Sequence, residues 1–214
     1  MASEVDICNL ALAHLGDNAT IASIDPPEGS AQAEHCQRFY PIARDTLLEM
    51  HSWNFATKRV RLTEIVESGA YSKSTEWDYV YQLPNDTLQI IDVFKEGVTD
   101  DYSEPGASDY VPQPYQTEVM HNGNKIIRTD VPDAEMRYVA TISDTTKFSP
   151  LFVMALSWQL ASLLAGPIMK GEVGAAEAKR AAQMMSVYLG EARKSDAAQR
   201  NIKPEHKVPW MTGR

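Results

Sequence analysis

The sequence predicts an α+β fold: an antiparallel helical bundle of about four helices, a small antiparallel β-sheet lobe inserted into it, and an extended C-terminal arm. Three observations support this prediction. Apolar side chains recur at helical spacing towards both ends of the chain, alternate with polar ones in the middle, and lose any period in the last twenty residues. The expected organisation is a helical bundle domain over residues 1–56 and 144–194, a β-rich lobe over 57–143, and an arm over 195–214.

Two helices are predicted near the start of the chain. Ser3 is placed to cap the first, and Asp6 stands three residues later, at the second position of a capping box. The second helix, expected over 31–51 after a cap at Ser30, carries one continuous apolar seam suited to packing in a bundle. Pro41 removes a backbone donor from this helix, so we expect the helix to kink or split there.

The middle of the chain has the pattern of a small antiparallel sheet. Asn122-Gly123 is a strong hairpin signal, because both residues tolerate the positive φ that a tight turn requires. A long loop is predicted between Glu96 and Pro114. Its acidic residues Asp100, Asp101, Glu104 and Asp109 could bind calcium but lack the spacing of a known calcium loop. Five segments are predicted strands: 77–83, 88–94, 116–121, 125–129 and 136–142.

Helix is expected to return at Ser149-Pro150, a cap followed by proline at the first helical position. Residues 151–169 contain no charged side chain, a length that could cross a bilayer. Polar residues within this segment and Gly166-Pro167 near its end favour a buried core helix instead, so no membrane span is predicted. An alanine-rich final helix follows over 172–194.

Composition and charge restrict the function classes. The chain has 214 residues and a formal net charge of −9, which argues against a generic nucleic-acid binder. The charge is uneven: residues 195–214 carry +2, and the remainder carries −11. Residues 1–4 have no basic run, so we expect no signal peptide. Cys8 and Cys36 could form a disulfide or hold a metal, although a pair of buried thiols fits their helical context better.

No catalytic constellation stands out in the sequence. The five histidines form no H-E-x-x-H motif and have no ligand spacing with cysteine, and neither a G-x-S-x-G elbow nor a phosphate-binding glycine loop is present. The sequence therefore predicts no catalytic residue, no metal and no cofactor, and hence a protein that is not an enzyme and acts through its surfaces. A glycosidase-type pair of carboxylates stays open, because acidic residues are plentiful.

Several blocks of sequence resemble one known family. The first comprises Ile7–Gly16 and Ile21–Asp25, the second Tyr40–Glu49 followed by Trp53–Ala56, and the third Trp77–Asp86. Together they are similar to podovirus tail tubular protein A, the head–tail adaptor (connector) family of phage tails. The W-N-F-A segment at 53–56 is the most specific part of the resemblance, which covers most of residues 5–190 in element order.

This resemblance implies a structural virion protein. A homo-oligomeric ring of about twelve copies would lie between the portal and the tail nozzle, a tail tubular protein B-like partner, and complete the DNA ejection conduit. The expected location is the virion neck, after assembly in the host bacterial cytoplasm. An acidic body would let genomic DNA pass without specific binding, because phosphate contacts from Lys and Arg would retard it.

The resemblance also gives the C-terminal arm a role in portal binding. The proposed portal contacts are Lys203, Pro204, Lys207, Pro209 and Trp210, with Trp210 as anchor because aromatic residues dominate interface energies. Truncation at Ser195 is expected to preserve the fold and weaken portal binding. Three alternatives remain: the arm is a disordered terminus, the protein hydrolyses cell-wall glycan, or it is a helical interaction module unrelated to phages.

Overall fold

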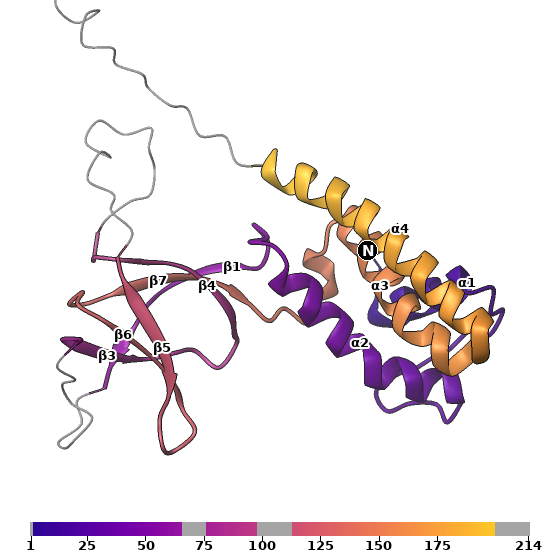
Figure 1. Ribbon diagram of the computed structural model, residues 1–214, viewed down its shortest axis with the longest axis horizontal. Coiled ribbons are helices and arrows are strands. Elements are labelled where there is room, and N and C mark those ends of the chain that lie inside the picture. The colour runs from indigo at the N-terminus through magenta and orange to yellow at the C-terminus, as the bar shows by residue number, and fades with distance from the viewer. Residues whose placement is uncertain (1, 66–75, 98–112, 200–214) are drawn as a thin grey trace, which may run out of the picture. The chain divides into compact units, whose positions relative to one another are not determined.

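The computed structural model describes residues 2–65, 76–97 and 113–199 (Figure 1). The described chain divides into two compact units, a helical unit over Met1–Ala56 and Thr141–Gln199 and a β unit over Thr57–Ala140. The helical unit contains α1 (Glu4–His14), α2 (Ala31–Glu49), a 3₁₀ turn η2 (Thr145–Lys147), α3 (Pro150–Met169) and α4 (Gly171–Ala197). The β unit contains β1 (Thr57–Arg61), β2 (Thr63–Glu64), β3 (Tyr79–Gln82), β4 (Thr87–Phe94), β5 (Tyr115–Val119), β6 (Lys125–Thr129) and β7 (Glu135–Ala140).

The predicted fold, an antiparallel four-helix bundle with one inserted β-sheet, is wrong. The described strands form two antiparallel sheets, ordered β1-β7-β4 and β2-β3-β6-β5. The helices are arranged around α3, which packs against α1, α2 and α4 in turn. The sequence pattern marks apolar faces but does not specify which faces meet, so it could not distinguish a bundle from helices gathered around a central one.

Two strands of the β unit were missed by sequence analysis. β1 and β2 consist mostly of charged and threonine side chains and have no apolar alternation. They form because β1 pairs with β7, from Thr57 opposite Val139 to Arg61 opposite Glu135, and β2 pairs with β3. Partners this distant in the chain leave no local signature.

Capping side chains start the helices where the sequence predicts. Ser3 Oγ accepts a hydrogen bond from the Asp6 backbone N–H at 3.1 Å, and the Asp6 carboxylate accepts one from the Ser3 N–H at 2.8 Å. Ser30 and Ser149 cap α2 and α3 in the same manner. The predicted split at Pro41 does not occur, because α2 runs from Ala31 to Glu49 as one helix.

The α3 helix is the core of the helical unit. Among the described residues it is the one helix long and apolar enough to cross a membrane, but half of it is buried within the protein, and core helices have the same composition. α4 returns along α3 after a tight turn in which Lys170 and Gly171 have φ values of 55° and 59°. The two backbones come close at Gly174, where a Cβ atom would lie 2.9 Å from the Ala165 carbonyl oxygen.

The β5–β6 hairpin forms at the predicted turn. Gly123 has φ of +86°, and its N–H donates to the Met120 carbonyl oxygen at 2.8 Å. β6 lies between β3 and β5 and is almost entirely buried. β4 and β5 each lie at the edge of their own sheet, and β4 has two irregularities in its pairing with β7.

Candidate functional site

The five predicted portal contacts, Lys203, Pro204, Lys207, Pro209 and Trp210, lie outside the described residues. The described chain nevertheless shows where their segment begins. α4 continues to Ala197, so the first residues assigned by sequence to the arm are helical. The candidate site is therefore the base of the arm, where the ends of α2 and α4 meet.

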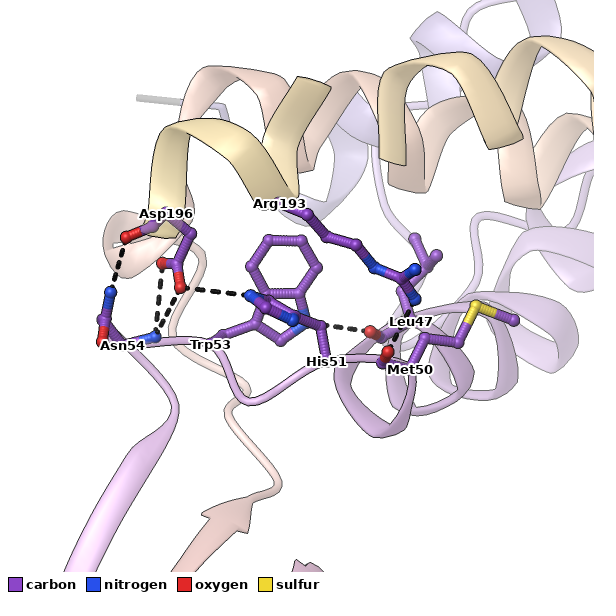
Figure 2. A network of polar contacts seen from close by, with 7 residues as sticks. All are labelled: Leu47, Met50, His51, Trp53, Asn54, Arg193 and Asp196. Atoms are coloured by element: carbon purple, nitrogen blue, oxygen red, sulfur yellow. Dashed lines mark hydrogen bonds and ion pairs between the residues drawn. The ribbon is translucent and has the colours of Figure 1, made fainter. Parts of the chain in front are cut away.

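Asp196 is the centre of this site, which we call the α2–α4 junction (Figure 2). Its residue is 6% exposed, and both carboxylate oxygens accept a hydrogen bond from the Asn54 backbone N–H, at 3.2 and 3.1 Å. In return, the Asn54 side-chain amide donates to the Asp196 carbonyl oxygen at 2.7 Å. Because a buried carboxylate requires compensating donors, this reciprocal pair fixes the last turn of α4.

His51 supplies a further contact to the same carboxylate. Its Nε2 atom lies 3.5 Å from Asp196 Oδ2, and the pair becomes ionic when the imidazole is protonated. The imidazole also meets the Trp53 ring edge-on, with centroids 4.8 Å apart. His51 therefore connects the polar part of the junction to its aromatic part.

The junction also satisfies carbonyl groups at the end of α2. The last carbonyls of a helix have no partner within it, and donors from elsewhere must supply one. Trp53, which is fully buried, donates its Nε1–H to the Leu47 carbonyl oxygen at 2.9 Å. Arg193, one turn before Asp196, donates through Nη2 to the Met50 carbonyl oxygen at 2.6 Å. α4 thus caps α2 while α2 holds the end of α4.

Sequence analysis singled out Trp53–Ala56 but missed Asp196. It treated Asp196 as one charge in a polar tail, although a helical period was present. Leu189, Ala192 and Asp196 stand at i, i+3 and i+7 and are all buried on one stripe of α4. Extending the apolar stripe by one turn would have placed Asp196 inside the helical unit.

One serine–histidine contact has the residue types of nucleophilic catalysis, but its geometry argues against that role. His14 Nε2 lies 3.0 Å from Ser157 Oγ, and the hydroxyl donates to the Met154 carbonyl oxygen at 2.9 Å. A hydroxyl has one proton, so the imidazole is the donor here, whereas an activating histidine must accept the serine proton. Ser157 is also fully buried. The contact is therefore a packing interaction between α1 and α3.

The surroundings of His14 fit this structural role. Its imidazole stacks on the Trp158 ring with centroids 3.7 Å apart. The Arg180 guanidinium lies over the same Trp158 ring, with its Cζ atom 5.3 Å from the ring centroid. Burial, and then the charge of Arg180, lower the pKa of His14 from its ordinary value. A neutral imidazole is thus the form that this packing favours.

The two cysteines are free and buried, one on α1 and one on α2. A hydrogen bond with Cys36, followed by burial, raises the pKa of the Cys8 thiol. Within the described residues no three His, Cys, Asp or Glu side chains are arranged to hold a metal ion. The two thiols therefore form a packing contact between α1 and α2.

Comparison with known proteins gives no assignment. No protein-family model matches this sequence, and no curated protein matches it.

Proposed function

We propose that this chain is a head–tail adaptor subunit of a bacteriophage virion, acting in a ring of about twelve copies between the portal and the tail nozzle. One observation carries the proposal. The most specific block of the family resemblance, Trp53–Ala56, contains Asn54, whose backbone and side chain hold Asp196 at the end of α4, where the arm begins. A rigid base is what an arm needs if it is to present its side chains to a partner at a defined place.

Charge supports the same proposal. Residues 1–194 carry a net charge of −11, which repels the negatively charged DNA duplex. Salt in the cell screens this repulsion, so it acts only within about one Debye length of the protein surface. A DNA conduit requires this: the duplex stays hydrated and is not retained by phosphate contacts. The protein should accordingly show no tight DNA binding at physiological salt.

In this proposal the arm is the portal-binding element. The proposed portal contacts are Lys203, Pro204, Lys207, Pro209 and Trp210, with Trp210 contributing most because large aromatic side chains bury the most surface. The junction would contribute indirectly, by fixing where the arm leaves α4.

The structure changes how the proposal should be tested. Truncation at Ser195 would remove Asp196 and leave the Asn54 N–H without its acceptor, so loss of binding could reflect damage to the helical unit. Truncation after Gln199 keeps α4 and the whole junction. Trp210→Ala in the full chain is a second variant that leaves every described contact in place.

The experiment is co-sedimentation of the purified chain with portal rings from the same genome, with negative-stain averaging of the product. We expect the full chain to add a ring to the portal, and we expect truncation after Gln199 to abolish this addition. Trp210→Ala should weaken it. If the full chain does not associate with the portal at micromolar concentration, the adaptor proposal is wrong. If the truncated chain binds equally well, the assignment of portal binding to the arm is wrong.

A further inference from the structure

The β unit contains a groove that the proposed function does not use. The groove has a volume of about 540 Å³ and lies between the first half of β4 and the length of β5. Leu88 and Ile90 line one side, and Tyr115 and Val119 line the other. This volume is within the range of about 300–1,000 Å³ that is typical of sites for small ligands and peptide side chains.

Both walls of the groove are edge strands of the described sheets. β4 ends one sheet and β5 ends the other, so each has backbone groups on its outer side with no other described strand beside them. Pairing of β5 with β6 is regular over all five of its residues. Val119 is 66% exposed and Tyr115 is 38% exposed, so this edge presents two large apolar side chains to solvent. Such an edge is suited to an additional extended segment.

We propose that this groove binds the C-terminal arm of a second copy of the chain, residues 200–214. When a portal is present, the arm would instead bind there; this second half of the inference rests on the proposed function. The groove would then hold the arm of a neighbouring copy until a portal competes for it.

Charge favours this occupant. Residues 57–140 contain eight basic and fifteen acidic side chains, a net charge of −7. Residues 200–214 contain four basic side chains and one acidic, a net charge of +3. Because association of oppositely charged surfaces is steered by their fields, the arm should approach the β unit of another copy rapidly at low salt.

The sequence of the arm also fits the groove. In an extended chain, side chains two apart point to the same side, so Val208 and Trp210 can enter the groove together. Pro209, between them, has no N–H and therefore requires no hydrogen-bond acceptor. Fifteen residues span at most about 50–54 Å when extended.

The first experiment measures whether the groove binds the arm. A fluorescent peptide of residues 200–214 is titrated with the full chain carrying Trp210→Lys, whose own arm lacks its anchor, and anisotropy is recorded. We expect saturable binding that weakens as salt is raised, and no binding by the same peptide with Trp210→Lys. Adding Val119→Lys to the protein should weaken binding at least about tenfold, because a charge would then occupy the apolar wall.

Two further variants make this result specific to the groove. Thr117→Lys places a charge at another exposed position on β5 that lines the groove, and should weaken binding as well. Val187→Lys is the matched control, since this valine on α4 is 59% exposed and lies in the helical unit. The groove is not the site if Val119→Lys and Thr117→Lys leave binding unchanged, or if Val187→Lys weakens it equally.

The second experiment decides whether the arm comes from another copy. Sedimentation velocity is measured on the unsubstituted chain, which keeps both arm and groove, on Val119→Lys, which keeps only its arm, and on Trp210→Lys, which keeps only its groove. We expect the unsubstituted chain to self-associate as its concentration rises and both variants to remain monomeric. An unsubstituted chain that stays monomeric although the groove binds the peptide would show that the arm occupies the groove of its own chain, and would overturn the inference.

Failure of the inference can be distinguished from failure of the adaptor proposal. Neither experiment contains a portal, so the peptide-binding and sedimentation results do not depend on whether the chain binds a portal. In a third step, portal rings are added to the self-associated unsubstituted chain, and release of the arm is expected if the portal and groove compete. Arm binding to the groove without any effect of the portal would retain the groove and refute the competition.

Discussion

A pair of glycine substitutions within one helix tests how closely α3 and α4 approach. Gly174 and Gly190 both lie inside α4, but a Cβ atom added at Gly190 would have no neighbour within 4 Å, whereas one at Gly174 would lie 2.9 Å from the Ala165 carbonyl oxygen. Real Cβ atoms essentially never come this close to backbone, and a backbone oxygen cannot rotate away as a side chain can. Gly174→Ala must therefore push the two helices apart.

The expected magnitudes have opposite signs. Replacing glycine by alanine in a helix interior stabilises it by about 0.5–1 kcal/mol, and Gly190→Ala should gain this in full. Gly174→Ala gains the same amount but overpacks the interface at a cost of about 2–3 kcal/mol, a net loss of about 1–2.5 kcal/mol. At about 2–4 °C per kcal/mol for a chain of this size, Tm should rise by about 1–4 °C in the first variant and fall by about 2–10 °C in the second.

The assay is thermal unfolding followed by circular dichroism at 222 nm, where the helical unit dominates the signal. A Tm for Gly174→Ala equal to or above that of the unsubstituted chain would refute the close approach of the two helices at this point.

Three further predictions concern individual polar contacts. Asp196→Ala leaves the Asn54 N–H without its acceptor and should lower the free energy of unfolding in urea by about 2–3 kcal/mol, while Asp196→Asn, which retains an acceptor oxygen, should lose less. The pKa of His14 is lowered in the folded chain, so as the pH falls the unfolded chain binds a proton at this residue before the folded chain does. The free energy of unfolding should therefore keep its full His14 contribution above about pH 6.5 and decrease below that pH. His14→Gln should reduce this decrease between about pH 7.5 and 5.5. Glu118→Ala leaves the buried Arg128 guanidinium without its carboxylate and should destabilise the protein by about 1–3 kcal/mol. Glu96→Ala removes one side of the Arg61–Glu96 pair, in which both side chains are exposed, and should change stability by under about 0.5 kcal/mol. Equal effects of the two substitutions in urea denaturation would contradict the burial argument.

Local chemistry made some elements predictable. Ser3, Ser30 and Ser149 begin helices because each side chain accepts a hydrogen bond from a backbone N–H that the helix cannot satisfy itself. Asn122-Gly123 forms a hairpin because glycine adopts the positive φ required there. These features depend on a few neighbouring residues, so sequence alone was sufficient.

Contacts between distant segments were not predictable in this way. β1 is a strand because of its pairing with β7 and its ion pairs, including Arg59 Nε with Glu135 Oε2 at 3.3 Å, and none of these partners is near it in sequence. Asp196 belongs to the junction because it meets Asn54, 142 residues earlier. The candidate site depends on this long-range contact, which explains why sequence analysis found only the tryptophan side of it.

The central position of α3 has a consequence for synthesis on the ribosome. α1 and α2 both pack against α3, yet α3 begins at Pro150, 100 residues after α2 ends at Glu49. At about 5–20 residues per second, the two N-terminal helices emerge about 5–20 s before their partner. All the described strands emerge within that interval, so the β unit can complete its folding first. A stalled or prematurely terminated chain would therefore carry a folded β unit and two helices with uncovered apolar faces, the species that chaperones and proteases would be expected to recognise.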